Sequence, residues 1–465
     1  MKHMLWRALR TARPVVWLGF VLVAGRAQSP LTLEQAVDQA MTKYPAVRAS
    51  LQQVSAAAAG INLARTSYLP RADFLGQVNR GTHNNVFGLM LPQSVISPIS
   101  GPVLRTNSLD SVWGSAVGLL VSWEPFDFGL RHANVEVARS ARDSVSAQVA
   151  VTSLEAGTAA ADAYLTIAAA QQTVLAARAG VERARVLNQV IETLAKNELR
   201  PGADASRSRA ELALAETQLI QAEQAADVGR AALAQVLGVP PGTITIEPGP
   251  LVKAPPEAEN TARPIAQHPM AIAQNAAIEE VKAREKALDR SYFPRFNLQG
   301  TSYARGTGID PLGVTGGALS GLGPNIQNWA VGMSITFPAF DLPSIRARKQ
   351  IEHFHELAES ARYDQVLQDL NGQVEKARAT LAGARRVAKN TPIELDAARA
   401  SEQQATARYK AGLATVVEVA EAQRILTQAE IDDALARLNI WRAMLALSAA
   451  EGDLAPYLDE VRRAR

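Results

Sequence analysis

Four short segments of the chain alternate apolar and polar positions. In residues 328–337, the side chains of Trp329, Val331, Met333, Ile335 and Phe337 fall on one face, and small or polar residues fall on the other. The segments 70–80, 112–123 and 294–303 show the same period of two. This period predicts β-strands with one apolar face. It is typical of outer-membrane barrels, although a soluble sheet packed on a core gives the same pattern.

The spacing of aromatic residues in these strands favours a membrane. Trp113 and Trp123 are ten residues apart, which is about 33 Å along an extended strand. A tilt of roughly 45° reduces this to about 23 Å of height, close to the separation of two aromatic girdles. Trp113, Trp123, Trp329 and Phe337 are therefore predicted to form a lipid-facing aromatic girdle. The side chains of Met333 and Ile335 should face lipid. Those of Ser334 and Thr336 should face a lumen.

Long helical patterns separate and flank the strands. Residues 130–199 contain no proline and few glycines, and a helix of this length would extend about 105 Å. Such a helix needs neighbours along its length, so an antiparallel coiled coil or bundle is implied. Further helices are predicted over 31–66, 204–237, 263–290, 344–411 and 413–450.

The order of these elements is duplicated. The sequence SYLPR at 67–71 returns as SYFPR at 291–295, Phe126-Asp127 returns as Phe340-Asp341, and Gly202 returns as Gly412. We therefore divide the mature chain into a first structural repeat, 28–250, and a second, 251–465, which together form one fold unit. Residues 239–256 hold six prolines, which exclude a helix and indicate a connector.

The N-terminus carries the pattern of a secretory signal peptide over residues 1–27. A basic stretch precedes 11 apolar residues, too few to cross a bilayer as a helix, and a small-residue cleavage site follows. These 27 residues contain five basic and no acidic residues, so a chain with 48 basic and 45 acidic residues becomes slightly acidic without them. A nucleic-acid partner therefore has no overall electrostatic support.

Four strands cannot close a membrane barrel, whose usual minimum is eight strands. The chain must then share its barrel with copies of itself. Two copies would give an interior filled by side chains, and three would give 12 strands and a lumen. The fold class is accordingly mainly α, with a small membrane β-barrel to which each chain contributes four strands.

Motifs for enzymatic chemistry are missing from the sequence. None of GxSxG, GxxxxGK[ST], HExxH or a strand-following GxGxxG occurs, and there is no cysteine. His353 and His355 are two residues apart and would lie on different faces of a helix, so shared metal ligation is not expected. The sequence predicts no enzyme, no cofactor and no metal site.

Taken together, these features resemble the TolC-like outer-membrane efflux protein family over essentially the whole mature chain. The resemblance is carried by SYLPR and SYFPR, by FDFGLRHANVEVA at 126–138, and most specifically by RYKAGLATVVEVAEAQ at 408–423. It implies a homotrimer with a 12-stranded barrel in outer-membrane lipid and a helical tunnel through the periplasm. It further implies docking on a periplasmic adaptor protein and an inner-membrane pump, and passive transport without catalytic residues.

The same resemblance places a periplasmic gate at the helix tips. Its tyrosine, turn glycine and acidic positions fall on Tyr409, Gly412, Glu418 and Glu421, whereas a gate arginine found in some members is replaced by Ala414. The first-half tip turns at Gly202 and adds the gate candidates Asp204 and Arg207.

Glu418 and Glu421 are three residues apart and share a helix face, so three copies would place two rings of carboxylates at the mouth. A solvated helix face is the alternative for these glutamates. For the whole protein, the alternative to an export duct is a trimeric coiled-coil scaffold or adhesin of the cell surface that has no conducting lumen.

Overall fold

The structure is a computed structural model that describes residues 30–86, 101–105, 107–255 and 263–464. The predicted signal peptide, residues 87–100 and 106 between the first two predicted strands, and the end of the proline-rich connector lie outside the described residues. Elements follow along the chain as α1 (Leu33–Lys43), α2 (Pro45–Thr66), β1 (Arg71–Thr82), β2 (Ser111–Phe126), α3 (Leu130–Lys196), α4 (Gly202–Leu237), α5 (Pro269–Arg290), β3 (Arg295–Thr307), β4 (Ile326–Thr336), α6 (Leu342–Lys410), α7 (Val416–Ala450) and α8 (Ala455–Arg463).

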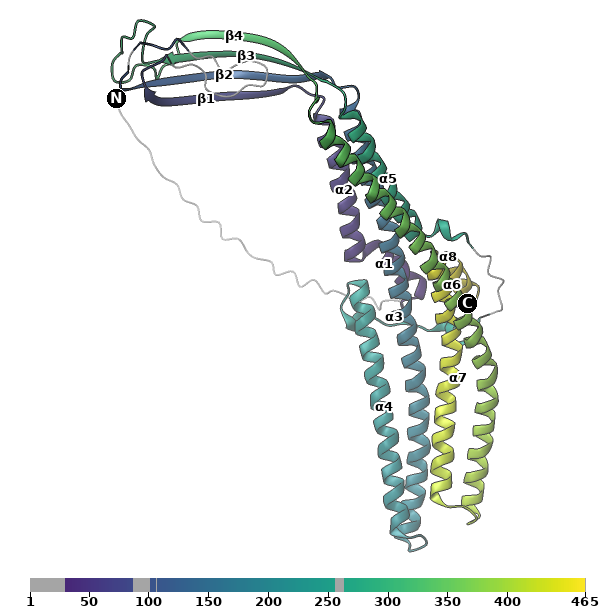
Figure 1. Cartoon of the computed structure of the whole chain (residues 1–465). Coiled ribbons are helices and arrows are strands. Elements are labelled where there is room, and N and C mark those ends of the chain that lie inside the picture. The colour runs from purple at the N-terminus through teal and green to yellow at the C-terminus, as the bar shows by residue number, and fades with distance from the viewer. Residues whose placement is uncertain (1–29, 87–100, 106, 256–262, 465) are drawn as a thin grey trace, which may run out of the picture.

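The four strands form one antiparallel sheet in the order β1-β2-β3-β4, at one end of the molecule (Figure 1). Its register joins Phe74, Leu119, Ser302 and Trp329 in one row across the sheet. The alternation along each strand decides which face is apolar. One face exposes a set of large apolar side chains: Phe74, Val78, Leu119, Trp123, Trp329, Val331, Met333 and Ile335. The predicted period of two and the four predicted strands are confirmed.

The opposite face of the sheet is rich in polar side chains. Gln299 and Thr301 on β3 are buried there. Their register partners on β2 are Ser122 and Leu120, and Gln77 on β1 faces Ala116. An apolar face turned outward and a polar face turned inward is the reverse of a soluble sheet on a hydrophobic core.

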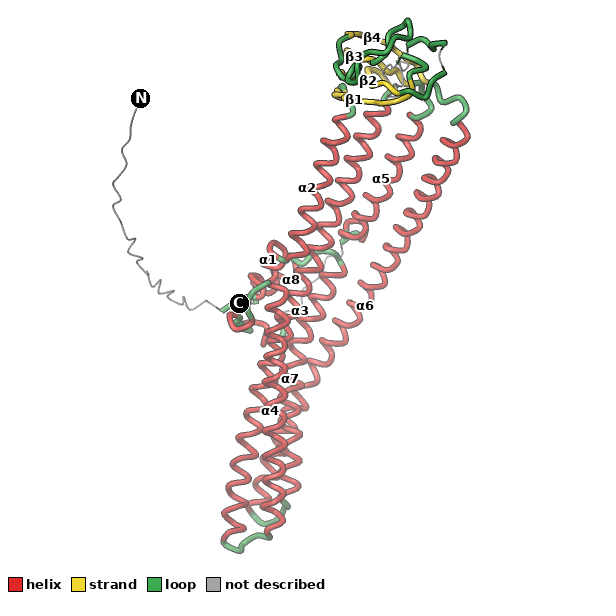
Figure 2. Tube along the Cα trace, turned by 90° about the vertical axis from the view of Figure 1, so that its left-hand side faces the viewer, coloured by secondary structure: helices red, strands yellow, loops and turns green. Residues whose placement is uncertain are grey.

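Two helices run almost the whole distance from the sheet to the far tips. The helix α3 has 67 residues and α6 has 69, about 100 Å each. Near the sheet they pack with α2 and α5, and toward the tips they pack with α4 and α7 (Figures 1 and 2). The mainly helical, antiparallel architecture predicted from the sequence is confirmed.

The main hydrophobic core lies where the two sets of partner helices meet. Trp441, Tyr164 and Ile167 are fully buried there among alanines of α3. The indole Nε1 of Trp441 donates a hydrogen bond to the carbonyl of Lys253 (2.9 Å), which fixes the connector against α7. Small residues let the helix backbones approach closely, so alanine dominates this seam. No helix within the described residues is both long and apolar enough to cross a bilayer.

Several predicted element boundaries were wrong, each for a local reason. The single helix expected over 31–66 is two helices, because Pro45 forces Tyr44 out of the helical region (ψ 135°). His268-Pro269 has the same effect, so α5 begins at Pro269 rather than at 263. The helix α8 was not predicted; Tyr457, on this helix, packs edge to face against Trp441.

Candidate gate at the helical tips

The structure ends in two helical hairpins whose tips lie at the end opposite the sheet (Figure 1). The α3–α4 turn spans 197–201, and the α6–α7 turn spans 411–415. Gly412 adopts φ +75°, a left-handed conformation that favours glycine. Gly202 is the first residue of α4, and the left-handed residue of its turn is Glu198 (φ +60°).

Tyr409 forms the contact between the two tips. Its side chain is buried against Ile191 of α3 and Ala205 of α4. The guanidinium of Arg200 lies over the Tyr409 ring, 4.9 Å from its centroid, in cation–π geometry. Burial raises the pKa of the Tyr409 hydroxyl, which Arg200 opposes and the nearby carboxylate of Asp204 reinforces.

The hydroxyl of Tyr409 contributes less to the contact between the two tips than its ring does. Within the described residues this buried oxygen has no hydrogen-bond partner. Sequence reasoning did not single out Arg200, although the residue stands in the tip sequence between Leu199 and Pro201. Of the other predicted gate residues on this tip, Asp204 lies in the first turn of α4, and Arg207 is exposed further along the same helix.

Glu418 stabilises the start of α7, and the sequence contains the motif for this role. Thr415 and Glu418 form a capping box at the start of α7: the Glu418 amide donates to Thr415 Oγ1 (3.4 Å), and the Glu418 carboxylate accepts from the Thr415 amide (3.1 Å). The spacing Thr-x-x-Glu is the signature of this motif, and it was overlooked. Arg408 at the end of α6 lies 3.4 Å from the same carboxylate.

Glu421 is exposed and paired with an arginine. The Arg424 guanidinium, one turn along α7, donates two hydrogen bonds to its carboxylate, at 2.6 and 3.0 Å. The hydrogen bond from Arg424 lowers the pKa of Glu421. Each predicted ring carboxylate therefore has a cationic neighbour within its own chain.

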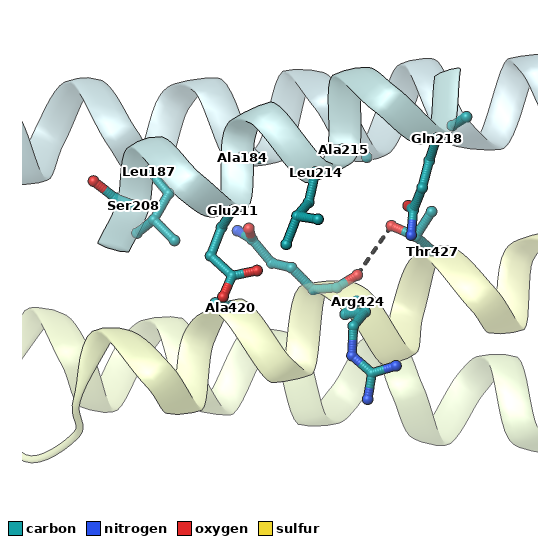
Figure 3. A pocket seen from close by; sticks show the side chains of 13 residues that line it. Ala184, Leu187, Ser208, Glu211, Leu214, Ala215, Gln218, Ala420, Arg424 and Thr427 are labelled. Carbon is teal, nitrogen blue, oxygen red and sulfur yellow. Dashed lines mark hydrogen bonds between the residues drawn. The ribbon is translucent and has the colours of Figure 1, made fainter. Parts of the chain in front are cut away.

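The two hairpins are joined again above the tips. Arg183 of α3 donates to both carboxylate oxygens of Glu430 on α7 (2.8 and 3.3 Å) and to Thr427 Oγ1 (2.8 Å). Gly180 permits this approach, because a Cβ there would lie 2.9 Å from Thr427 Oγ1. Gly180 and Thr427 also line a groove between the α3–α4 hairpin and α7, with Glu211 and Leu214 on its α4 side (Figure 3).

The four predicted girdle residues occupy three levels of the sheet. Trp113 lies near the loop end of β2, beneath the Arg80 guanidinium (5.2 Å to the ring). Trp123 lies near the helix end of β2, where its Nε1 donates to the carbonyl of Tyr68 (3.0 Å). Phe337 follows β4 at that same end, whereas the register places Trp329 level with Leu119, between the two ends.

Comparison with known proteins agrees with this architecture. The family model for outer membrane efflux proteins matches residues 36–239 and 265–453. The chain therefore belongs to the outer membrane efflux protein family. It is an outer-membrane protein with a helical extension into the periplasm, and the family and its structural neighbours are channels rather than enzymes.

Individual relatives match over most of the chain. Protein CyaE of Bordetella pertussis (strain Tohama I) is 27% identical over 433 residues, which are 91% of this chain and 84% of CyaE. The CmeC outer membrane channel of Campylobacter jejuni is 14% identical, with a TM-score of 0.71 over 93% of this chain and 89% of CmeC. The outer membrane protein VceC of Vibrio cholerae is 18% identical, with a TM-score of 0.68 over 90% of this chain and 96% of VceC.

Proposed function

We propose that three copies of this chain form the outer-membrane exit duct of a tripartite efflux or secretion system. The duct would receive substrates from an inner-membrane pump through a periplasmic adaptor protein and pass them outward without chemical change. The single observation that carries this proposal is the open four-stranded sheet with an exposed apolar face.

The edges of that sheet require partners in a membrane. The outer edges of β1 and β4 have no neighbouring strand in the sheet. Each unsatisfied backbone group in the hydrocarbon region costs several kcal/mol. The edge strands have 12 and 11 residues, and they run in opposite directions, so β1 of one copy can pair antiparallel with β4 of the next. Repeating this pairing three times gives 12 strands around a lumen.

The helices support the same association. Large apolar side chains are exposed on the outer faces of α3, α4 and α6, including Leu175, Ile220 and Phe354. Long helices that expose large apolar side chains need further helices to cover those side chains. Three copies would enclose a tunnel that ends at the hairpin tips.

The tip contacts would then act as the gate. Opening the inner mouth requires the α6–α7 tip to move relative to the α3–α4 tip. The contact between Arg200 and Tyr409 spans the two tips within one chain, so it opposes this movement. Glu418 and Glu421 would line the mouth together with Arg408 and Arg424, which makes the ring mixed in charge rather than purely acidic.

Conductance in planar lipid bilayers tests the proposal. The purified protein should insert as a heat-labile oligomer with the mass of three chains, and it should show a small, mostly closed conductance. A detergent-stable monomer with native strand content would contradict the shared barrel. A stable trimer that never conducts, even with Tyr409→Ala at the gate, would instead support a scaffold without a lumen.

A further inference from the structure

Outside the tips and the sheet, the structure brings together three metal-ligating side chains from two helices. Glu285 lies on α5, and His353 and Glu356 lie on α6, in the part of the bundle close to the sheet. Their ligand atoms all lie within 4.8 Å of one another. The two helices pack side by side (Figures 1 and 2).

The antiparallel packing of α5 and α6 sets these residues in three successive levels. Lys349 Nζ lies 2.6 Å from the Asp289 carboxylate at the level nearest the sheet. One turn further, Glu285 faces His353. At the third level, the negative charge of Glu356 helps to raise the pKa of Lys282. The middle level thus joins a carboxylate to an imidazole, and its nearest cation, Lys349, belongs to the level above.

The neighbouring lysines have better partners elsewhere. Lys349 is 3.8 Å from Glu285 but hydrogen-bonds Asp289 at 2.6 Å. Lys282 hydrogen-bonds Glu279 on its own helix at 2.9 Å. Each lysine makes its shortest contact with another carboxylate, so Glu285 and Glu356 are only partly neutralised by these lysines.

The donor set suits a borderline transition metal. One imidazole nitrogen and two carboxylates are ligands that Zn²⁺ accepts at about 2.0–2.2 Å. In a tetrahedral site, such bonds place the ligand atoms roughly 3.4 Å apart. His353 Nδ1 and a Glu356 oxygen are 4.0 Å apart, too far for a hydrogen bond. Small side-chain rotations would bring the three ligands onto one ion.

We propose that Glu285, His353 and Glu356 bind one Zn²⁺ ion per chain and that the ion ties α5 to α6 beneath the sheet. His353 is half exposed, and the side chains of Glu285 and Glu356 retain about a fifth to a quarter of their accessible surface, so an ion can enter from solvent and keep a water ligand. This site is independent of the tip gate and of the exported substrate.

Zinc titration of the purified full-length assembly in detergent, after removal of metals with a chelator, tests the site. Calorimetry should show one Zn²⁺ bound per chain. His353→Ala and Glu285→Gln should each weaken binding by about tenfold or more. Zn²⁺ should also raise the thermal unfolding midpoint of the wild type but not that of His353→Ala.

His355→Ala provides the matched control. His355 stands two residues away on α6 and is equally exposed, but its neighbour is Glu352 of the same helix (3.5 Å). This variant should bind Zn²⁺ as the wild type does. Absence of saturable binding, undiminished binding by His353→Ala, or an equal loss in His355→Ala would each overturn the proposal. Circular dichroism and the assembled mass establish that each variant is folded.

Discussion

The guanidinium of Arg200, in the α3–α4 turn, lies 4.9 Å from the centroid of the Tyr409 ring, at the end of α6. The two residues are 209 positions apart in sequence, yet they close the contact between the two tips. A cation–π contact at a partly exposed site contributes about 0.5–1 kcal/mol. Arg200→Gln should therefore raise the open fraction of the channel by about two- to fivefold, measured as open probability in single-channel recordings.

Tyr409 separates the role of the ring from that of the hydroxyl. Because the hydroxyl has no hydrogen-bond partner among the described residues, Tyr409→Phe should retain the contact and leave the open fraction close to that of the wild type. Tyr409→Ala should lose both the contact with Arg200 and the buried packing, at a cost of about 3–5 kcal/mol to the tip. If Tyr409→Phe opens the channel as strongly as Tyr409→Ala, the hydroxyl makes a bond between copies that one chain does not contain.

Charge at the mouth is expected to depend on pairs rather than on single glutamates. Glu421→Gln should lower cation selectivity, because it leaves Arg424 unpaired, whereas Arg424→Gln should raise it by freeing Glu421. Reversal potentials in a salt gradient measure both. Glu418→Gln preserves the capping box at the start of α7. Glu418→Ala removes only its carboxylate hydrogen bond and should destabilise that helix end by about 0.5–1.5 kcal/mol. Equal selectivity in all variants would place the filter elsewhere.

The two faces of β4 should respond differently to a charge. Met333 is 64% exposed on the apolar face of the sheet, and Ser334 points to the other face. Met333→Arg should cost about 2–4 kcal/mol if the residue lies near the bilayer midplane, and Ser334→Arg much less. The yield of heat-labile trimer on unboiled gels compares them. Equal yields would contradict the assignment of the lipid-facing side.

His268 should make stability depend on pH. Its ring accepts a hydrogen bond from the Met270 amide (3.1 Å) at the start of α5, and burial lowers its pKa below the ordinary value of 6.5. The neutral ring is favoured in the folded state, so its contribution is complete above about pH 6.5 and is lost as pH falls below that value.

The thermal midpoint measured between pH 7.5 and 5.5 checks this expectation. His268→Asn, which can still cap the helix, should have a flatter pH dependence than the wild type over this interval. The exposed His355→Asn serves as the control and should follow the wild type. An unchanged slope in His268→Asn would assign the pH dependence to another group.

The sequence predicted the elements better than the contacts between them. Strand alternation around Trp329 and the proline-free run of α3 are local patterns, so both elements were found with nearly correct bounds. The meeting of Arg200 with Tyr409, or of Glu285 with His353, depends on the rotational phase of helices joined through distant turns. Small deviations from 3.6 residues per turn accumulate over such lengths, so a sequence does not reveal these neighbours.

Some local sequence signals for helix starts were nevertheless missed. Thr415 and Glu418 have the spacing of a capping box, and Tyr44-Pro45 and His268-Pro269 mark the helix starts that the predicted ranges missed. Neither interpretation of Glu418, as a gate charge or as a solvated surface residue, included its contribution to the fold.

The continuity of α3 and α6 has a mechanical consequence. Their partners change halfway, from α2 and α5 near the sheet to α4 and α7 near the tips. Among the described residues, only α3 and α6 run from the sheet to the tips. They are the struts through which a force applied at the periplasmic tips reaches the membrane end. A twist imposed on the tips is thus shared by two parallel rods rather than absorbed at a joint, and a flexible insertion would have to interrupt both rods to disconnect the two ends.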